Sequence, residues 1–503
     1  MVAPPEPQQP SKPQHHGPPQ QPNQPRQPDP PQQPARQATP PSAPLADLVA
    51  VLRAALPPGR VLTDPDVVER YRHDEAEWAE YGRPVAVVRP EGTAEVAAVV
   101  RACAAHRVPV VPRGAGTGLS GGANAVDDCV VLSTERMRTI VEIDPGERLA
   151  VVQPGVVNED LRTAAARHCL WYPPDPASAP WSTIGGNVAT NAGGLCCVKY
   201  GVTRDYVLAL EVVTASGEVV RVGRRTAKGV AGYDLVGLLV GSEGTLGVIT
   251  EITVRLRPLR AAPTRTVVGF FDSLAACGRA VAGVTARGLE PSAFELIDRH
   301  CLAAVNEWKH TGLPQDAAAL LLARTDLPEP AAEVEASAIR EEFEKAGATE
   351  ALMSTDAVEA EALFDARRLA YPALEQRGDA ILTEDVCLPR GRLAEMLQRV
   401  ADIAARHEVL VANIAHAGDG NLHPLLITPH GDDDARRRAQ AAFAEIVDAA
   451  IDLGGTVTGE HGVGLLKRDG MRRELGPAVV ALQRAVKQAL DPEGILNPGK
   501  VVG

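Results

Sequence analysis

Aromatic residues are scarce in this chain of 503 residues, where Phe, Trp and Tyr together make up 3%. Proteins that stack on nucleic-acid bases need such rings, and proteins that bind a phosphate backbone need clustered Lys and Arg. Cations are also in deficit, with 51 Lys and Arg against 64 Asp and Glu and a formal net charge of −13. These two shortages argue against a nucleic-acid partner.

Closely spaced cysteine pairs are missing as well. The eight cysteines include no C-x2-C pair, so their spacing does not suit an iron–sulfur site and is typical of reduced thiols. The sequence also has no apolar run of roughly 18 residues, which a membrane-spanning helix needs, and no basic-then-apolar signal segment at its start. We therefore expect a cytoplasmic protein with no integral membrane segment.

The composition changes along the chain. Residues 1–44 are rich in Pro and Gln, a composition that cannot bury enough apolar surface to fold, so we predict a disordered tail. Short strands recur between a few helices over 45–260, and strands alternate with longer helices over 261–503, which predicts an α+β fold. The expected elements of the second region include strands over 266–271, 380–388 and 409–414 and helices over 333–345, 392–407, 434–453 and 478–490.

Two histidines seven residues apart, His416 and His423, flank a glycine-rich turn, and Gly459-Glu460-His461-Gly462 follows farther along the chain. Imidazole and carboxylate are the ligands of open catalytic metal sites, in which one position stays free for substrate. A single His on an apolar strand is usually a hydrogen-bonded core residue. Four coordinating side chains within two glycine-rich turns have little structural use, however, and we predict a divalent metal site.

A third glycine-rich segment, Gly116-Thr-Gly118-Leu-Ser-Gly121, matches the G-x-G-x-x-G pattern and follows a predicted strand. The Rossmann version of this pattern requires a helix directly after the glycines, but here residues 122–128 lead into another strand. We therefore reject an NAD site of the Rossmann type. The glycines still expose backbone N–H groups beside Arg113, and such a concavity binds phosphates.

Two more segments, 183–194 and 241–247, are also rich in glycine. In the first, Asn and Thr alternate with small residues and offer donors and acceptors suited to a flat heteroaromatic ring. Together with 116–121, these segments make three glycine-rich segments within the region 45–260. They predict a long ligand that lies across this region, such as a dinucleotide cofactor.

Four segments, 112–122, 184–194, 241–247 and 416–423, resemble in sequence and order the FAD-linked oxidoreductases of the vanillyl-alcohol oxidase superfamily. The most similar branch contains the glycolate oxidase flavin subunit and the D-lactate dehydrogenases, and the resemblance covers about Leu45 to Val502. It implies an FAD-binding domain of two α+β subdomains over 45–260. It also implies an α+β C-terminal domain over 261–503, with an antiparallel sheet, C-terminal helices and the substrate and metal sites.

The resemblance assigns FAD-binding residues. Those expected at the pyrophosphate are Arg113, Gly114, Gly116, Thr117, Gly118, Ser120, Gly121 and Gly122. Those expected around the isoalloxazine and ribityl groups are Pro174, Asp175, Thr183, Gly185, Gly186, Asn187, Asn191, Gly193 and Gly194. Glu243, Gly244 and Ile249 would lie near the adenosine half or its supporting loop, and Asn497 would close over the flavin. No histidine lies between Arg113 and Asn124, so we expect non-covalent FAD.

The reaction implied by the resemblance is FAD-dependent oxidation of a small D-2-hydroxy acid, D-lactate or glycolate, to the 2-keto acid, with hydride transfer to flavin N5. His416, His423 and Glu460 would bind a divalent metal, Zn, Mn or Fe, that polarises the substrate hydroxyl. His461 would accept the hydroxyl proton as general base.

An arginine is implied for the substrate carboxylate. Arg367 is expected in this role, with Arg368 as the alternative if the register differs by one. The dicarboxylate branch of the family has a polar residue where this chain has Leu425 and a lysine that the segment 382–386 lacks, which favours a monocarboxylate. A D-2-hydroxyglutarate-type dehydrogenase and a non-catalytic FAD-binding subunit of a multi-subunit oxidase are the alternatives.

The electron acceptor is open at this stage. A quinone, a cytochrome, an electron-transfer flavoprotein and a partner iron–sulfur subunit are all open, and so is direct reaction with oxygen. Any association with a membrane would then be peripheral, through that acceptor.

Overall fold

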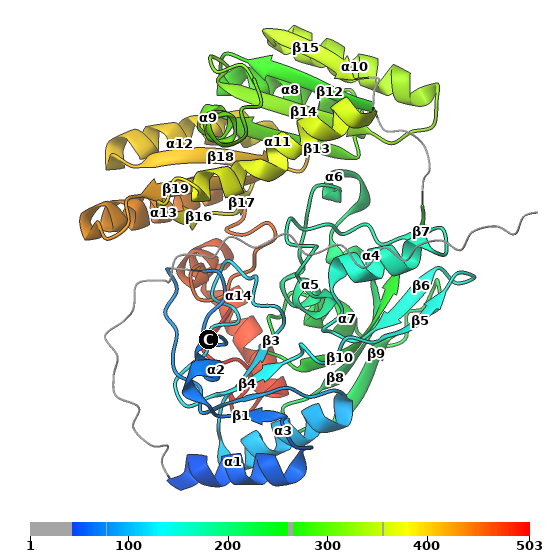
Figure 1. The fold of residues 1–503 in the computed structure, drawn as a ribbon, viewed down its shortest axis with the longest axis vertical. Helices are drawn as coiled ribbons and strands as arrows, with labels where there is room; N and C mark the ends of the chain where they lie inside the picture. Colours follow the sequence, from blue (N-terminus) through cyan, green and yellow to red (C-terminus); the bar gives the residue numbers. More distant parts are fainter. Residues whose placement is uncertain (1–42, 77, 260–264, 355–356) are drawn as a thin grey trace, which may run out of the picture. The chain divides into compact units, whose positions relative to one another are not determined.

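The computed structural model describes residues 43–76, 78–259, 265–354 and 357–503 (Figure 1). The tail predicted over 1–44 lies outside these residues except for its last two, which open the first helix. The described chain is α+β, as predicted, with two sheets of four and five strands in its first half and one large antiparallel sheet in its second half.

The first sheet has the strand order β1-β2-β4-β3, in which β2, β4 and β3 run parallel. Its strands are β1 (Val61–Leu62), β2 (Ala86–Val88), β3 (Val110–Arg113) and β4 (Val130–Ser133), and the helices of this part are α1 (Ala43–Ala55), α2 (Pro65–Glu69) and α3 (Thr93–His106). Parallel strands are buried on both faces, which explains the unbroken apolar runs of β2 and β4. No helix lies between β3 and β4, whose connecting residues are all described, so the structure supports rejection of a Rossmann site.

The second sheet is antiparallel, in the order β5-β6-β10-β8-β9. Its strands are β5 (Ile140–Asp144), β6 (Leu149–Val152), β8 (Val207–Val213), β9 (Val219–Gly223) and β10 (Val248–Arg255). Beside it lie α4 (Asn158–Ala166), α5 (Ile184–Thr190), η1 (Thr203–Asp205), α7 (Leu235–Leu239) and the small pair β7 (Leu170–Trp171) and β11 (Arg257–Pro258). The short helix α6 (Cys197–Tyr200), between α5 and η1 in sequence, contacts the large sheet of the second half. Together the two sheets form the two α+β subdomains that were expected of the first half.

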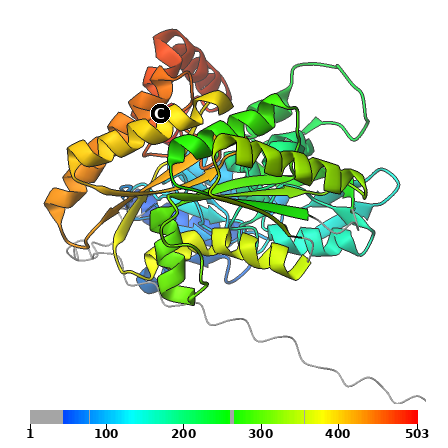
Figure 2. The ribbon, with the colours of Figure 1, turned by 90° about the horizontal axis from the view of Figure 1, so that it is seen from above.

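The third sheet has the order β15-β12-β14-β13-β18-β19-β16, with β17 also paired to β19. Its strands are β12 (Arg265–Phe271), β13 (Ala293–Asp298), β14 (Ala319–Thr325), β15 (Glu350–Ser354), β16 (Ala380–Thr383), β17 (Val386–Cys387), β18 (Leu410–His416) and β19 (Asn421–Thr428). Helices cover both of its faces (Figure 2). One face carries α8 (Leu274–Ala286), α10 (Ala331–Ala346), α12 (Leu393–His407), preceded by η2 (Arg390–Arg392), and α13 (Asp433–Asp452), and the other carries α9 (Arg299–Lys309) and α11 (Ala357–Glu375).

The second half departs from the sequence predictions at two points. The strand expected over 380–388 is interrupted at Glu384 and Asp385, which separate β16 from β17, because the Asp385 carboxylate turns into a buried polar cluster. The helix expected over 478–490 matches the second part of α14 (Arg468–Leu490), after a kink at Gly476 (φ +72°) and Pro477, whereas the helical part that precedes the kink was not predicted.

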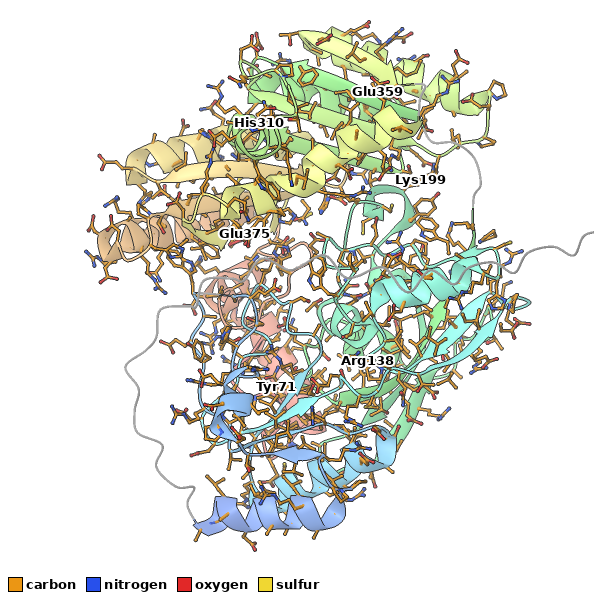
Figure 3. The ribbon with its side chains drawn as sticks, in the orientation of Figure 1. Tyr71, Arg138, Lys199, His310, Glu359 and Glu375 are labelled. Atoms are coloured by element: carbon orange, nitrogen blue, oxygen red, sulfur yellow. The ribbon has the colours of Figure 1, made fainter. Side chains whose placement is uncertain are left out.

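The helix α6 connects the two halves of the chain through Asp326. Lys199 of α6, labelled in Figure 3, places its Nζ 2.5 Å from Oδ1 of Asp326, which follows β14. The Tyr200 hydroxyl donates to the same carboxylate.

Within the described residues, no helix is long and apolar enough to cross a membrane.

Candidate active site

The hairpin of β18 and β19 brings the first two histidines together. His416 pairs with Asn421 and Ile414 pairs with His423, so the histidines are diagonal neighbours on one face of the hairpin. Their ring centroids are 5.4 Å apart at an interplanar angle of 89°. The turn requires Gly420, whose φ is +86° and whose Cβ, if present, would lie 2.2 Å from the Leu388 carbonyl oxygen.

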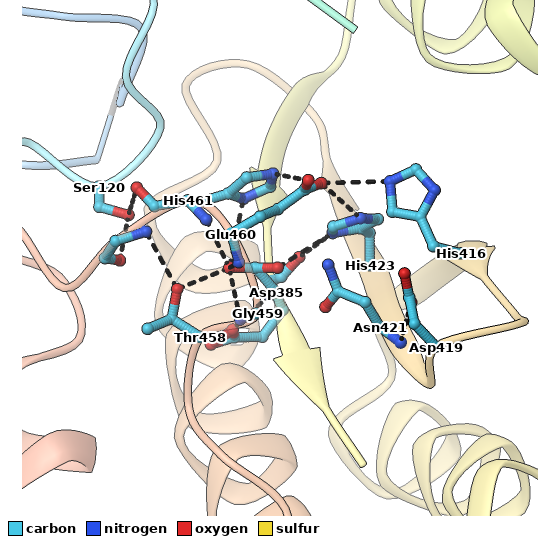
Figure 4. Close-up of polar contacts among 12 residues, drawn as sticks. Ser120, Asp385, His416, Asp419, Asn421, His423, Thr458, Gly459, Glu460 and His461 are labelled. Carbon is cyan, nitrogen blue, oxygen red and sulfur yellow. Dashed lines mark hydrogen bonds and ion pairs between the residues drawn. The ribbon is translucent and has the colours of Figure 1, made fainter. Parts of the chain in front are cut away.

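Three imidazoles converge on one oxygen of Glu460. The Nε2 atoms of His416, His423 and His461 lie 3.2, 3.3 and 3.7 Å from Glu460 Oε1 (Figure 4). In a tetrahedral site with metal–ligand distances of about 2.0–2.1 Å, neighbouring ligand atoms are about 3.3 Å apart. The distances to Glu460 Oε1 are compatible with such a site, but the donor atoms that all lie within 4.8 Å of one another belong to Asp385, His423, Glu460 and His461, and the predicted ligand His416 is not part of this group. His416 and His423 are only 7% and 6% exposed, so the cluster is shielded from solvent.

Asp385, which the sequence analysis missed, holds the segment that carries Glu460. This segment, Thr458–Gly464, is called the Glu460 turn below. The Oδ2 atom of Asp385 accepts four hydrogen bonds from it: from Thr458 Oγ1 at 2.7 Å and from the backbone N–H groups of Gly459 (3.1 Å), Glu460 (3.1 Å) and His461 (2.9 Å) (Figure 4). Asp385 also shares a possible ligand cluster with His423, Glu460 and His461, whose donor atoms all lie within 4.8 Å of one another.

Two polar atoms of this cluster lack a hydrogen bond. Asp385 Oδ1 and His461 Nδ1 are buried without a hydrogen-bond partner among the described residues. His423 Nδ1 lies 3.6 Å from Asp385 Oδ1. Buried polar atoms of this kind are costly unless a ligand or ion completes them, which is a second sign that the cluster binds something.

The pKa values of His461 and His416 are shifted in opposite directions. Burial lowers the pKa of His461 to about 4, which leaves this imidazole neutral near pH 7. Burial also opposes charge on His416, but Glu295 and Glu460 outweigh it and raise its pKa well above the ordinary value. Burial disfavours the ionised Asp385 carboxylate, yet His461 and nearby cations outweigh that penalty and hold its pKa below the ordinary value.

Glu295 of β13, which the sequence analysis also missed, joins His416 to Arg367. Its Oε1 lies 2.8 Å from His416 Nδ1, and its Oε2 accepts from Arg367 Nε at 2.8 Å. The Glu295 carboxylate is fully buried and Arg367 is 9% exposed. Arg367 is thus a buried cation paired with the same carboxylate that contacts His416, whereas Arg368 is an exposed residue paired with Glu361 and Asp365.

The loop 113–122 leaves the end of β3 and folds back on itself. Arg113 Nη1 donates to the His73 carbonyl at 2.7 Å, and a Cβ at Gly116 (φ +81°) would lie 2.0 Å from Arg113 Nη2. Gly114, Gly116, Thr117, Gly118 and Gly122 are partly exposed, and Arg113, Ser120 and Gly121 are buried. The loop touches the next predicted segment, since a Cβ at Gly114 would lie 2.6 Å from Thr183 Oγ1.

The segment 183–194 reaches the histidine cluster. Thr183 caps α5 by accepting from Gly186 N at 3.2 Å, and Asn191 ends this helix with φ +55°. Beyond it, a Cβ at Gly193 would lie 2.5 Å from Glu460 Oε2. The segment expected to hold the flavin ring is therefore in contact with the proposed metal ligands.

The other residues predicted around the isoalloxazine and ribityl groups lie in or next to the segment 183–194. Asp175 accepts from Cys196 N at 3.0 Å, and a Cβ at Gly194 would lie 2.4 Å from the Asp175 carbonyl. Asn158 Nδ2 donates to the Pro174 carbonyl at 3.1 Å and to Asn187 Oδ1 at 2.9 Å. A Cβ at Gly185 would lie 2.5 Å from Pro154 Cβ. Pro174, Asn187 and Gly185 thus fix the local backbone.

Of the residues predicted near the adenosine half of FAD and over the flavin, some contact the site and one does not. Glu243 directs its carboxylate at the Glu460 turn, accepting from Val463 N at 2.7 Å and Gly464 N at 2.9 Å. Asn497 donates to the carbonyls of Gly122 and Glu243, at 2.9 and 2.7 Å. Gly244 (φ +71°) packs against Pro112, whereas Ile249 pairs with Val212 inside the second sheet, away from the cluster.

Comparison with known protein families agrees with this arrangement. Residues 84–223 match the FAD binding domain, and residues 260–501 match the C-terminal domain of FAD linked oxidases. The chain belongs to the FAD-linked oxidase family. The predicted family is thereby confirmed, and with it FAD as the cofactor class and oxidoreductase as the enzyme class.

Curated relatives align over most of the chain. It is 40% identical over 443 residues to the glycolate oxidase subunit GlcD of Bacillus subtilis, covering 88% of this chain and 92% of the relative. It is 35% identical to a D-lactate dehydrogenase of Anaerostipes hadrus (88% and 95%) and 32% identical to a D-2-hydroxyglutarate dehydrogenase of Stutzerimonas stutzeri (90% and 98%).

A solved structure supports the fold. p-Cresol methylhydroxylase with substrate bound aligns with a TM-score of 0.77 over 92% of this chain and 97% of that chain, at 19% identity. At this identity the likeness shows the fold alone.

Proposed function

We propose that this chain uses non-covalently bound FAD to oxidise a small D-2-hydroxy acid, D-lactate or glycolate, to the 2-keto acid. The observation that carries the proposal is the convergence of three imidazole nitrogens on Glu460 Oε1, in contact with Gly193. Bound FAD would supply the hydride acceptor and a bound divalent cation would polarise the substrate hydroxyl. Two of the relatives are named for glycolate and D-lactate, which supports this substrate class.

The cation would be held by His416, His423 and Glu460, with Zn, Mn or Fe compatible with this donor set. Glu295 would orient His416 through its Nδ1, because a ligating imidazole is held best when its other nitrogen is hydrogen-bonded to a carboxylate. Asp385 lies close enough to contribute a further oxygen.

FAD would be held mainly by backbone groups. The loop 113–122 offers glycine N–H groups to the pyrophosphate, and the segments 174–175 and 183–194 border the place expected for the flavin ring. Glu243, Gly244 and Asn497 would stabilise this arrangement through their contacts with Val463, Pro112 and the Glu243 carbonyl, respectively.

His461 is the proposed general base. Its imidazole is partly buried and, with its pKa lowered to about 4, neutral near pH 7, so it can accept the proton that the substrate hydroxyl loses. Its Nε2 lies 3.7 Å from Glu460 Oε1, so a proton acceptor at this position would be beside the proposed metal ligands.

Arg367 is the proposed partner of the substrate carboxylate. Glu295 engages its Nε, which fixes the orientation of the guanidinium fork. Leu425, two residues after His423 on the same strand, is 1% exposed within an apolar cluster. No polar group at this position could receive a second carboxylate, which supports a monocarboxylate substrate.

The test is anaerobic bleaching of the FAD-loaded protein. We expect D-lactate or glycolate to bleach the flavin absorbance, L-lactate to be inert, and removal of the cation by a chelator to abolish bleaching. Bleaching by D-2-hydroxyglutarate alone would replace the proposed substrate. FAD-loaded protein that no hydroxy acid bleaches would favour a non-catalytic FAD-binding subunit.

A second prediction concerns the contact between Gly193 and Glu460. The Gly193→Ala variant adds a methyl group that would lie 2.5 Å from Glu460 Oε2, so the carboxylate must move away from the histidines. We expect Mn²⁺ affinity, measured by titration calorimetry on the FAD-loaded protein, to fall by about tenfold or more. Gly391→Ala is the control, because its methyl group would meet no atom within 4 Å and the residue lies outside the proposed FAD and metal sites. Equal Mn²⁺ affinity in both variants would contradict the prediction.

A further inference from the structure

Glu243 lies far from Glu460 in sequence and yet contacts the turn that carries it. The residue has a left-handed backbone, with φ +50°, and is 7% exposed. Its Oε1 accepts from Val463 N at 2.7 Å and its Oε2 accepts from Gly464 N at 2.9 Å. One buried carboxylate thus satisfies two consecutive backbone donors shortly after Glu460 and His461.

The backbone of Glu243 is tied to the loop 113–122. Asn497 Nδ2 donates to the Glu243 carbonyl at 2.7 Å and to the Gly122 carbonyl at 2.9 Å. A Cβ at Gly122 would lie 2.8 Å from Glu243 Oε2. Glu243 therefore contacts the end of this loop and the Glu460 turn at the same time.

Ser120 of the same loop makes a second, parallel connection. Its Oγ donates to the Gly462 carbonyl at 2.8 Å, and its carbonyl accepts from Leu465 N at 2.7 Å. The two backbones are closely packed here, since a Cβ at Gly464 would lie 2.1 Å from the Ser120 carbonyl oxygen. A displacement of the loop must therefore be followed by the Glu460 turn.

We propose that Glu243 is a positioning residue that couples the two sites: ordering of the loop 113–122 by FAD is transmitted through Glu243 to the turn that carries Glu460 and His461. The inference rests on the proposed function for the identity of the two ligands. It requires FAD and the divalent cation to bind cooperatively, each raising the affinity for the other by the same factor, typically about 5–150-fold.

Hydrogen exchange measures this coupling without any metal. Amide exchange in peptides spanning 456–467 is followed in metal-free protein, with and without FAD at a concentration that saturates each variant. We expect FAD to slow exchange in the wild type by ~5–150-fold and to have almost no effect in Glu243→Ala. The Glu243→Gln variant keeps one carbonyl acceptor for the two N–H donors and should lie between them, which keeps the test valid if the alanine variant fails to fold.

The matched control is Glu211→Ala. Glu211 of β8 is another largely buried carboxylate of the first half, but its partners are Thr93, Thr250 and Arg221, and none of these belongs to the Glu460 turn. A general loss of stability would affect both variants, whereas loss of the FAD-dependent protection should be confined to the Glu243 variants.

The Mn²⁺ affinity of the same proteins, with and without FAD, completes the experiment. Protection that depends on FAD and on Glu243 supports the inference even if Mn²⁺ does not bind, a result that would count against the metal-assisted reaction alone. Protection that is absent in the wild type, or unchanged in both Glu243 variants, overturns the inference, whereas bleaching by a hydroxy acid in that case would leave the proposed function intact.

Discussion

Replacement of His461 by alanine is expected to slow reduction of bound FAD by the hydroxy acid by a factor of ~10²–10⁴, the usual contribution of a positioned general base. The expectation follows from the partly buried, neutral imidazole and from its place beside the proposed metal ligands. The measurement is anaerobic stopped-flow absorbance at saturating substrate, on protein whose FAD and metal contents have been determined.

His407→Ala provides the comparison for this result. His407 ends α12 and pairs with Glu445 at the surface, so its loss removes an imidazole without touching the cluster. A reduction rate for His461→Ala within about tenfold of the wild type, with FAD and metal retained, would assign proton removal to another group.

The stability of the folded protein should decrease as the pH is lowered, because of His461. Because burial lowers the pKa of His461 from 6.5 to about 4, the folded protein keeps this imidazole neutral over a range in which the unfolded chain already takes up its proton. The folded state therefore loses stability as pH falls from 6.5 toward 4, by up to ~3 kcal/mol for this group. Denaturant unfolding of metal-free protein should show a smaller acid loss in His461→Gln. An equal loss would mean that His461 is not buried in the neutral form.

The sequence predicts the parts of the site that are local in the chain. His416 and His423 are joined by a short turn, so the antiparallel register of β18 and β19 alone places them on one face. Glu460 and His461 are adjacent in a second glycine-rich turn, and the two turns share residue types that suit one metal. The absence of a helix after Gly121 could likewise be predicted, because the residues that follow read as a turn and a strand.

The residues that complete the cluster come from distant parts of the chain. Glu295 and Asp385 reach it only through the pairing of β13 with β18 and of β17 with β19, which no local pattern specifies. A signal was present in both cases: Glu295 stands between Phe294 and Leu296 in an apolar strand, and Glu384 and Asp385 stand inside the predicted strand over 380–388. A charge at the centre of a buried strand requires a buried partner.

Replacement of Glu295 by alanine is expected to have the largest effect on stability. Its carboxylate lies between His416 and Arg367, both buried, and its loss leaves the Arg367 cation without this partner. Breaking a buried pair in this way costs about 3–5 kcal/mol of unfolding free energy. The loss of the group that orients His416 should also weaken metal binding by ~10–100-fold.

The two effects can be separated by comparing Glu295→Gln with Glu335→Ala. Glu335 of α10 is a buried carboxylate of the same domain that accepts from Glu290 N and the Thr325 hydroxyl, so its loss should destabilise the protein while Mn²⁺ affinity stays unchanged. In the glutamine variant, the oxygen of the new side-chain amide can still accept from His416 Nδ1, but its NH₂ group cannot accept from Arg367. This variant should therefore retain most of the Mn²⁺ affinity and show a higher KM, because Arg367 is no longer fixed. If Glu295→Ala were to bind Mn²⁺ as tightly as Glu335→Ala does, Glu295 would act on the fold alone.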